Sequence, residues 1–449
     1  MLKIASVDGL ECLFARSKNF KHLCLIPRNA QSESFIEDFK PYSSSKNLHS
    51  KKNIEFLVND ELIVRQTNLT ETLKTEGINM FFLAHRSSQY IENWAKKNKI
   101  TLIRTEWKLQ KNFEDKIFFQ KFLDKYSIPS PTTYILNSKK DFSKVKNFPA
   151  VIQFPYVNPP LPATFLRGVS DLKEFLNRKE IKFPLICREY VNGKPLGVSI
   201  LLGEKKMVFS SLRLQCFADK KDPFSEFLGI QWVSYKRFKK TEMENLNRVV
   251  LALAKALQKE KFTGVANVDL ISNDNGVYVL ECNPRMSSAT PCLALERQLV
   301  HGINFTEEFV NSLTKGELNF DYPKIPETTF EGTLIEFDFL IDEIKRDSNI
   351  KMISCLPKPG FWQFEANRLT YSGKKEKYFK NKSGFFFYSS LPKNFPIDDT
   401  KHLGLAFTNF PLFDFDSHKN TCKESTKGRR FIKSIIERLR ACLVYVEHL

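Results

Sequence analysis

The most constraining feature of this sequence is a pair of apolar-rich segments separated by four turn-forming residues. Residues 264–272 and 277–284 flank Asn273-Asp274-Asn275-Gly276. Asn, Asp and Gly are favoured in tight β-turns because they accept the positive φ values that such turns require. Apolar segments on both sides of such a turn predict a β-hairpin, so the fold must contain a sheet in which these two strands are neighbours.

The expected register of this hairpin brings two carboxylates together. With a three-residue loop that ends at Gly276 in the left-handed conformation, Asn273 pairs with Val277. Continued pairing then places Asp269 directly opposite Glu281. Two carboxylates about 5 Å apart across a sheet repel each other, and a divalent cation between them turns that repulsion into a binding site. The alternative is a surface hairpin whose acids have no joint role.

Two asparagines and an arginine extend the same face of the hairpin. Strand alternation puts Asn267 and Asn283 on the face that carries Asp269 and Glu281. Carboxylate and amide oxygens, completed by phosphate oxygens, are a ligand set that suits Mg²⁺. Arg285 points to the same side, and its guanidinium is expected to hold a phosphate or a substrate carboxylate.

The second strand also carries a recognisable motif. Glu281-Cys282-Asn283-Pro284-Arg285 resembles the E-x-N-P-R signature of ATP-grasp ligases, which include biotin carboxylase, carbamoyl-phosphate synthetase and D-alanine–D-alanine ligase. In that family the other metal ligand is an acid twelve residues before the signature glutamate, and Asp269 holds that position. The resemblance implies that Asp269, Glu281 and Asn283 bind Mg²⁺, with Mn²⁺ as an alternative, and that Arg285 contacts a phosphate or the substrate.

Two upstream segments resemble the phosphate-binding part of the same family. Asp115-Lys116, followed by a helix and by Ile128-Pro129-Ser130-Pro131, is similar to the segment that opens the family's catalytic domain. This resemblance implies that Lys116 contacts the phosphates of ATP; the alternative is a solvated helix lysine. Pro149-Ala150-Val151-Ile152-Gln153 resembles the phosphate-binding strand, in which Gln153 stands where the family usually has a lysine.

A third segment resembles the family's hinge strand. Arg188-Glu189-Tyr190-Val191-Asn192-Gly193 is similar to its E-x-[YF]-[IV]-x-G pattern. The resemblance implies that backbone groups near Tyr190 and Val191 bond the adenine of ATP and that Glu189 lies beside it. A strand edge suits this role because its free N–H and C=O groups are available to pair with a base.

Three departures from the family pattern concern nucleotide binding. Gln153 lacks the charge of the usual lysine. The glycine-rich flap is replaced by the proline-rich segment 155–162, and only Arg167-Gly168-Val169 resembles the end of a flap, so Arg167 is a candidate for the missing charge. Segment 195–197 also lacks the acid that binds ribose. These departures motivate the hypothesis of a degenerate ATP-grasp protein without turnover.

The leading hypothesis is an ATP-dependent ligase that joins a carboxylate to an amine, or to a thiol, through an acyl phosphate. ADP and phosphate are the expected products, and small-molecule carboxylates and amines are the expected partners. Arg213 and Lys236 are candidates for holding the acceptor or the γ-phosphate. The alternative for each of them is ordinary surface charge.

The predicted fold class is α/β and α+β, with a Rossmann-like N-terminal domain followed by a two-lobed ATP-grasp domain. Strand, helix and strand patterns at 78–83, 87–98 and 100–103 predict a parallel α/β unit. Helices are predicted at 113–125, after a Ser170 cap, after a Thr241 capping box, from Thr306 to about Gly316, and at 427–449. The expected domains are 1–110, 111–320 and a C-terminal extension of unknown role at 321–449.

Composition argues against several other classes of protein. Lysine and arginine exceed aspartate and glutamate by 18 charges, but the excess is scattered and does not form a basic stripe, so no nucleic-acid partner is expected. The nine cysteines lack C-x-x-C pairs, and residues such as Cys24, Cys187 and Cys355 lie in apolar runs, as expected of reduced thiols in a cytoplasmic protein. No apolar run approaches the roughly 20 residues of a membrane span. The basic amphipathic helix at 427–449 is expected to pack on the body, with docking to a membrane surface as the alternative.

Overall fold

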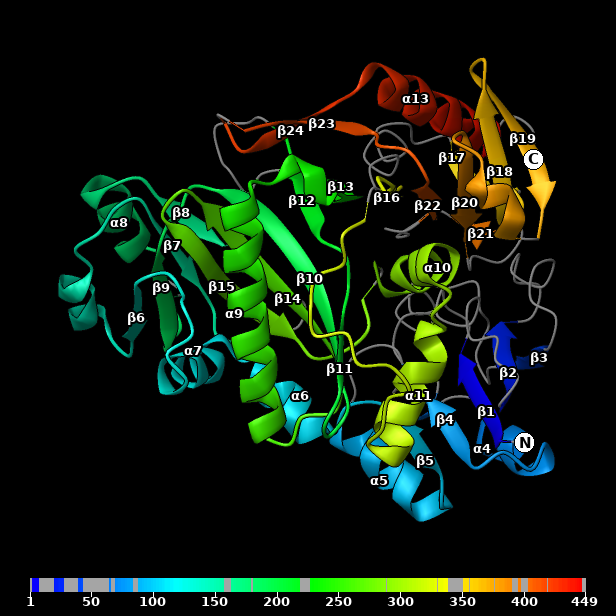
Figure 1. Ribbon diagram of the computed structural model, residues 1–449, viewed down its shortest axis with the longest axis horizontal. Coiled ribbons are helices and arrows are strands. Elements are labelled where there is room, and N and C mark those ends of the chain that lie inside the picture. Colours follow the sequence, from blue (N-terminus) through cyan, green and yellow to red (C-terminus); the bar gives the residue numbers. More distant parts are fainter. Residues whose placement is uncertain are drawn as a thin grey trace.

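The computed structural model has a mixed α/β architecture with five sheets (Figure 1). This arrangement confirms the predicted mixed class. The residues that the structure describes are 2–7, 20–27, 39–42, 64–65, 69–83, 88–156, 163–178, 181–218, 227–287, 289–328, 330–337, 350–354, 356–374, 376–389, 395–396, 403–417 and 419–445.

The N-terminal region forms a parallel five-stranded sheet, as the strand–helix–strand pattern predicted. Its strands, in spatial order, are β3 (Phe39–Tyr42), β2 (Phe20–Pro27), β1 (Leu2–Val7), β4 (Met80–Phe82) and β5 (Thr101–Ile103). Helices α4 (Leu69–Thr75) and α5 (Gln89–Asn98) accompany the sheet. Ser88 begins α5 as an N-cap, because its hydroxyl accepts a hydrogen bond from the Ile91 N–H.

A second sheet of eleven strands forms the centre of the molecule (Figure 1). Its strands, in spatial order, are β15 (Gly276–Asn283), β14 (Gly264–Asn273), β10 (Lys194–Leu202), β12 (Arg213–Phe217), β13 (Phe227–Trp232), β16 (Thr333–Glu336), β22 (Leu405–Thr408), β20 (Gly384–Tyr388), β18 (Gly360–Glu365) and β19 (Arg368–Gly373), with β11 (Met207–Phe209) paired to β10. Strands from the C-terminal third of the chain therefore extend the same sheet that contains the predicted hairpin.

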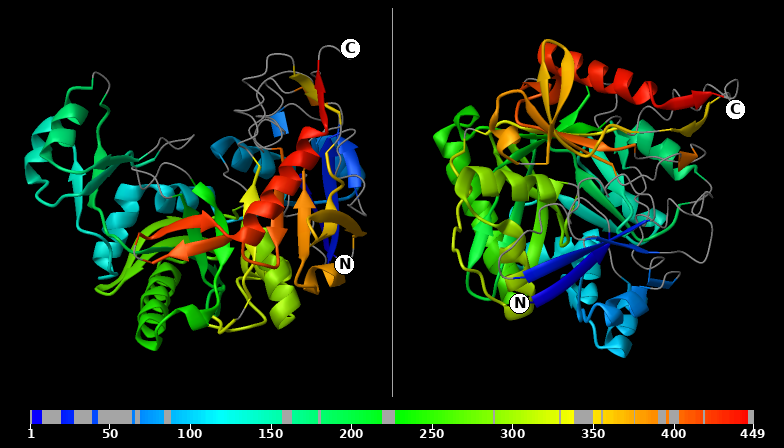
Figure 2. Two further views of the ribbon diagram at one scale, coloured as in Figure 1. Left: turned by 90° about the horizontal axis from the view of Figure 1, so that it is seen from above. Right: turned by 90° about the vertical axis from the view of Figure 1, so that its right-hand side faces the viewer.

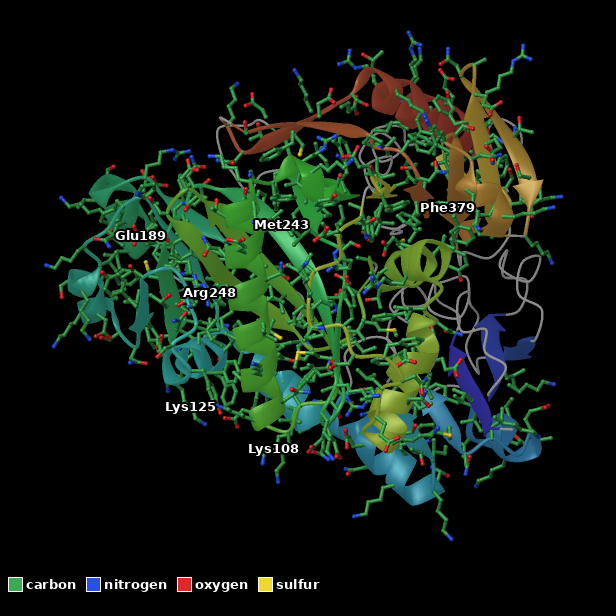
Figure 3. All side chains as sticks on the ribbon, viewed as in Figure 1. Lys108, Lys125, Glu189, Met243, Arg248 and Phe379 are labelled. Atoms are coloured by element: carbon green, nitrogen blue, oxygen red, sulfur yellow. The ribbon has the colours of Figure 1, made fainter. Side chains whose placement is uncertain are left out.

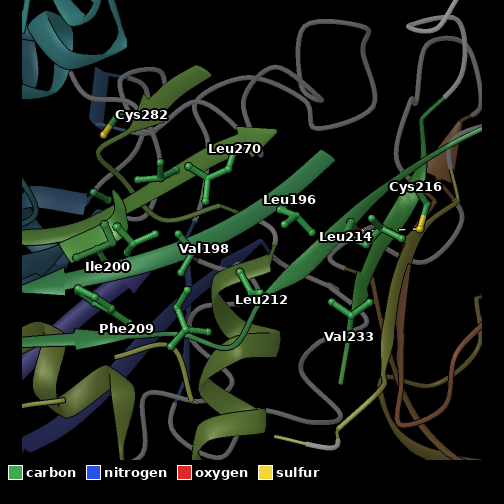
Figure 4. Packing of buried hydrophobic residues seen from close by; sticks show 14 of the residues in the cluster. Leu196, Val198, Ile200, Phe209, Leu212, Leu214, Cys216, Val233, Leu270 and Cys282 are labelled. Carbon is green, nitrogen blue, oxygen red and sulfur yellow. Dashed lines mark hydrogen bonds between the residues drawn. The ribbon is translucent and has the colours of Figure 1, made fainter. Parts of the chain in front are cut away.

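Helix α9 (Lys240–Lys259) covers one face of this sheet (Figure 1). Leu246, Val250 and Leu253 on α9 belong to the same buried cluster as the β-strand residues of that face. Figure 4 shows Leu196 of β10 between Leu270 and Leu214 of the neighbouring strands, which are its partners in the register. The helix was predicted correctly, but its capping box was not: Lys239 is the N-cap and makes no side-chain cap hydrogen bond.

A smaller four-stranded sheet stands apart from the main body in the view of Figure 2. Its strands, in order, are β6 (Thr133–Leu136), β9 (Leu185–Glu189), β7 (Ala150–Gln153) and β8 (Thr164–Leu166), accompanied by η2 (Lys139–Lys144) and α8 (Val169–Leu176). The predicted Ser170 cap is wrong, since Gly168 precedes α8 as its N-cap. We refer to residues 133–189 as the small lobe.

The helix predicted at 113–125 is two helices, α6 (Trp107–Glu114) and α7 (Lys116–Lys125). Asp115 separates them because its carboxylate accepts hydrogen bonds from the N–H groups of Ile117 and Phe118, both at 2.9 Å. An N-cap of this kind starts a new helix in a new direction. Lys116 is consequently the first residue of α7.

The remaining elements lie after the hairpin. They are α10 (Ala289–His301), α11 (Phe305–Lys315), η3 (Tyr235–Arg237) before α9, η4 (Glu376–Lys380), β17 (Ile350–Ile353), β21 (Phe395–Pro396), β23 (Phe413–Asp416), β24 (Thr421–Glu424), α13 (Thr426–Arg440) and β25 (Leu443–Tyr445). Helix α11 ends near Gly316, as predicted, and Gly316 is its C-cap in the left-handed conformation. Among the described residues, no helix is both long enough and apolar enough to cross a membrane.

Helix α13 packs against the body of the protein, as predicted, and is shorter than expected. Phe431, Ile435 and Leu439 point into the main buried cluster. The helix ends at Arg440 because the chain continues into strand β25. Six cysteines whose side chains the structure describes are free and buried, and Cys187 is one of them, as expected; the Cys24 side chain and Cys355 lie outside the described part.

Candidate active site

Strands β14 and β15 place Asp269 directly opposite Glu281, as the sequence predicted. The expected loop, however, is wrong. Asn273 pairs with Gly276, so the turn has two residues, and Gly276 has a φ of 154° rather than a left-handed helical value. A register shift between Asp269 and Leu270 compensates, because one residue of β15, Leu280, has no partner of its own. The bulge and the shorter turn offset each other at Asp269.

This bulge decides which side chains share a face. Leu270 and Val279, which pair with each other, lie in the buried cluster beneath α9. Without the extra residue, strict alternation would put Val279 and Glu281 on the same face. With it, the valine is buried under the helix while Glu281 faces the opposite side with Asp269. The Leu280 carbonyl, released from the ladder, accepts a hydrogen bond from Arg188 Nη1 of the small lobe at 2.7 Å.

The two carboxylates interact strongly with each other and with their neighbours. Burial, the charge of Glu281 and a hydrogen bond to Glu281 raise the pKa of Asp269 well above its usual range. Burial also raises the pKa of Glu281, but Lys116 and the hydrogen bond from Asp269 outweigh it and lower that pKa to about 2. Asp269 therefore takes up a proton more readily than Glu281. Gln215 donates to Asp269 Oδ1 at 2.6 Å.

Lys116 lies against the acid pair, where the sequence motif had suggested a phosphate contact. Its Nζ is 3.0 Å from Glu281 Oε2. The break between α6 and α7 sets this position, because Lys116 begins α7 and its backbone N–H donates to Pro155 O at 2.9 Å. That bond connects the start of the helix to the segment that follows β7.

The end of β15 carries the other two predicted residues. Asn283 Nδ2 lies 3.3 Å from Glu281 Oε1, so its amide is on the same face as the acids. Arg285 turns its Nε toward the buried Glu114 of α6, with 2.7 Å between Nε and Oε1. Asn267, opposite Asn283 in the register, donates to the Arg285 carbonyl at 2.6 Å and holds this segment in place.

Arg213 and Lys236, both predicted to hold substrate or phosphate, lie in different environments. Arg213 is buried on the same face as Asp269. Gly197 of the intervening strand lies between them: a side-chain Cβ at this position would be 3.6 Å from the Arg213 guanidinium and 3.8 Å from Asp269 Oδ1. Burial lowers the pKa of Arg213 to about 10, and Asp269 opposes that shift. Lys236, on η3, is exposed and lines a separate cavity.

The small-lobe candidates occupy two faces of β9 and its surroundings. Glu189 lies at 3.4 Å from Asn147 Nδ2, on the face opposite to Arg188. The N–H of Tyr190 donates to Pro149 O, whereas the N–H of Val191 makes no hydrogen bond to a described residue. Gln153 is half-buried, and the exposed Arg167 contacts Asp171 Oδ2 at 3.6 Å. Most of the proline-rich segment, residues 157–162, lies outside the described residues.

Three site residues escaped the sequence analysis. Gln215 could have been found, because it lies two residues after Arg213 on one strand and so shares its face. Glu114 is 171 residues from its partner Arg285, and no local pattern predicts that pairing. Arg188 is buried beside the site, and its Nε and Nη2 atoms make no hydrogen bond within the described residues.

The chemistry of the donor set fits a hard divalent cation. Asp269, Glu281 and Asn283 offer oxygen ligands on one face, and the mutual repulsion of the acids is what a cation would relieve. Among the described residues there is no cluster of three or more His, Cys, Asp or Glu that could hold a metal on its own. A cation here therefore needs the asparagine amide and oxygens from a ligand to complete its coordination.

Comparison with known proteins finds a family match within this chain. Residues 113–289 match the family described as ATP-grasp domain. Over 286 residues the chain is 22% identical to multifunctional protein URA2 of Saccharomyces cerevisiae, covering 61% of this chain and 12% of that protein. Over 223 residues it is 27% identical to the carbamoyl phosphate synthase large chain of Rhizobium meliloti, covering 44% and 19% respectively. The chain thus spans less than a fifth of the length of either relative.

The fold is similar to that of a solved biotin carboxylase. The structure from Campylobacter jejuni, in complex with β-γ-ATP, superposes with a TM-score of 0.66 at 11% identity, covering 99% of this chain and 92% of the other. The likeness at this identity concerns the fold. It confirms the predicted fold class.

Proposed function

We propose that the protein is an ATP- and Mg²⁺-dependent ligase that joins a carboxylate to an amine or a thiol; the match of residues 113–289 to the ATP-grasp domain family supports this proposal. A carboxylate oxygen attacks the γ-phosphorus of ATP, the bond to the β–γ bridging oxygen breaks, and ADP leaves. The amine or thiol then attacks the acyl carbon, the bond to the phosphate oxygen breaks, and inorganic phosphate leaves. We place this reaction in the cytoplasm, which the free buried thiols support.

The single observation that carries this proposal is the opposed pair of Asp269 and Glu281 with Lys116 beside it. The register fixes the two acids across from each other, and Lys116 Nζ lies 3.0 Å from Glu281. Two acids held together at a cost in electrostatic energy indicate a functional site more strongly than a structural one. A lysine next to them places positive charge where the phosphates of a bound nucleotide would lie.

The cation and the chain divide the work of neutralising charge. Asp269, Glu281 and Asn283 would hold Mg²⁺, with Mn²⁺ as an alternative ion. When bound, the ion neutralises negative charge on the phosphate oxygens as the phosphoryl group is transferred. The chain's own part is to present Lys116 to the phosphates.

Arg285 and Arg213 are assigned to the substrate side of the acid pair. Arg285 is oriented by the buried Glu114, and an arginine held in this way presents its remaining N–H groups in a fixed direction. We assign Arg285 to a phosphate or the substrate carboxylate. Arg213, buried beside Asp269, adds positive field at the same place.

The nucleotide base is assigned to the segment that follows β9. Val191 is the first residue of the predicted hinge whose N–H makes no hydrogen bond to a described residue, since the N–H groups of Glu189 and Tyr190 donate to Thr132 O and Pro149 O. We therefore assign the base contact to the Val191 backbone, with Glu189, Tyr190 and Gln153 as neighbouring residues. Arg167 remains a candidate for a phosphate contact.

An assay of product formation tests the proposal. Purified protein is given Mg-ATP with pools of carboxylates and amines, while ADP, AMP and phosphate are measured. Release of ADP that depends on both substrate pools is expected. Release of AMP would point to adenylation instead, and tight ATP binding without turnover in any pool would favour a degenerate ATP-grasp protein, which the neutral Gln153 motivates.

A matched pair of variants ties the assay to the acid pair. Asp269→Asn removes one predicted metal ligand, whereas Asp274→Asn changes an acid at the exposed turn of the same hairpin. Only the first variant should abolish ADP release and Mg²⁺-dependent ATP binding. Equal activity of the two variants would contradict the assignment.

A further inference from the structure

A cavity of about 1150 Å³ lies outside the acid pair. Its walls come from η3, α10, η4, the start of α13 and two connecting segments. Lysines, acids and phenylalanines from these elements line it, and each is named below where it bears on ligand binding. Neither Asp269 nor Glu281 is among its lining residues. Phe379 lies on the opposite side of the molecule from Glu189 of the small lobe (Figure 3).

The charge in this cavity is unbalanced in favour of lysine. Four lysines line it, namely Lys236, Lys380, Lys382 and Lys427, and none of them forms an ion pair with a described residue. The lining acids are already compensated: Lys324 lies 3.0 Å from Glu327, and Arg237 lies 2.6 Å from Glu331. Positive charge collected in a concave surface attracts anions.

The third lining acid, Glu296, adds little negative charge. It is fully buried and accepts a hydrogen bond from Ser211 Oγ at 3.0 Å. Burial raises its pKa to about 7, so this carboxyl is partly protonated at neutral pH. The four lysines are therefore the dominant charges of the cavity wall.

The start of helix α13 contributes a second feature that favours anions. Ser425 is the N-cap, and its hydroxyl accepts a hydrogen bond from the Gly428 N–H. The other N–H groups of the first turn have no intrahelical partner, as at the start of any α-helix. Lys427 is fixed in this first turn: its Nζ donates to Lys382 O at 3.0 Å and lies 3.6 Å from the centre of the Phe410 ring. The positive end of the helix dipole and the charge of Lys427 both attract an anion to the start of α13.

Part of the cavity lining is aromatic. The rings of Phe330 and Phe379 lie 6.3 Å apart and both border the cavity. A space of this volume exceeds what a bare inorganic ion fills and lies at the upper end for small organic ligands. Aromatic walls and a large volume favour a ligand that has an organic part as well as an anionic group.

We propose that this cavity binds a phosphorylated small molecule, with its phosphate at Lys382, Lys427 and the start of α13 and its organic part against Phe330 and Phe379. Helix N-termini bind phosphate through their free N–H groups, and lysine is a strong partner for a phosphate dianion. The site is separate from the acid pair, so the inference does not depend on the proposed ligase reaction.

Calorimetric titration without Mg²⁺ tests this site with three probes: phenyl phosphate, inorganic phosphate and benzoate. Phenyl phosphate should bind most tightly, because it offers both a phosphate and a ring. The double variant K382E/K427E should weaken its binding at least tenfold, and K380E should weaken it several-fold. The control K255E reverses an exposed lysine of α9 and should leave binding unchanged.

Three results would overturn the proposal. Benzoate binding as tightly as phenyl phosphate would remove the assignment to phosphate. Unchanged binding in both K382E/K427E and K380E, with thermal unfolding showing a folded protein, would remove the cavity as the site. A changed affinity in Asp269→Asn, in either direction, would place the probe at the acid pair instead, whereas loss of ligase activity alone would leave this inference intact.

Discussion

The two faces of the β14–β15 hairpin differ sharply in what they contact. One face carries Leu270 and Val279 into the buried cluster beneath α9. The other presents Asp269 and Glu281 to Lys116. The backbone and the hydrogen-bond ladder are common to both faces, so the difference lies entirely in the side chains and in the bulge that sets their phase.

This difference separates stability from chemistry within a single element. Burial of apolar side chains on the α9 face stabilises the fold. On the opposite face, two half-buried acids lie across from each other, and burial together with the charge of Glu281 raises the pKa of Asp269, which indicates an electrostatic cost. A substitution on the α9 face should therefore lower the stability of the fold and spare nucleotide binding. A substitution in the acid pair should lower the activity and spare the stability.

The largest effect is expected from the polar face. Asp269→Asn should lower the rate of ADP release by about a thousandfold, roughly 4 kcal/mol of transition-state stabilisation, because a cation ligand is lost. The same variant should leave the free energy of unfolding in metal-free buffer unchanged or higher, since a buried carboxyl is replaced by a neutral group. Urea unfolding and the product assay check both parts. A variant that is both inactive and markedly less stable would contradict the division between the faces.

The apolar face should show the reverse pattern. Leu270 is 1% exposed, and Leu270→Ala leaves a cavity under α9 that should lower the free energy of unfolding by about 3 kcal/mol. Any remaining folded protein should keep its affinity for Mg-ATP, because the acid pair faces away. Urea unfolding and calorimetry measure the two quantities, and a large loss of affinity in a fully folded sample would argue against independent faces.

Burial of the Glu296 carboxyl in the wall of the lysine-lined cavity should also appear in the pH dependence of stability. Burial raises the pKa of Glu296 from 4.5 to about 7, so the native protein keeps this proton between pH 4.5 and 7, where the unfolded chain has lost it. Stability from this group is present below pH 4.5 and declines by about 3 kcal/mol as the pH rises to 7. The variant Glu296→Gln should lack this contribution, so its free energy of unfolding should fall less than that of the wild type between pH 4.5 and 7. Parallel pH profiles for the two proteins would contradict the assignment to Glu296.

The smallest effect is expected at the turn that joins the two strands. Lys239 and Asp274 form an ion pair of 3.5 Å, with side chains that are 79% and 97% exposed. Exposed pairs of this kind contribute little. Lys239→Ala should leave the free energy of unfolding and the rate of ADP release equal to those of the wild type within experimental error. The turn variant therefore serves as a control for variants on either face. A clear change in either quantity would mean that the turn participates in the site.

The sequence alone predicted the central part of the site, but through a register that was only partly correct. The turn residues and the spacing of the two acids identified the hairpin and its opposed carboxylates. The loop was assigned one residue too many, and the bulge at Leu280 was not foreseen; these errors cancel at Asp269. A bulge depends on what packs against each face, here α9 on one side and Arg188 on the other, and a strand's own sequence does not contain that information.

What the sequence determined by itself was local: strand alternation, turn chemistry and a motif of five consecutive residues around Glu281. Their geometry follows from the covalent chain over a few residues, so the order of residues is sufficient to place them. Only the tertiary structure decided the contacts between distant segments, such as Glu114 with Arg285 and Lys116 with Glu281. The lysine-lined cavity is of the same kind, because its walls come from segments up to nearly 200 residues apart that packing alone brings together.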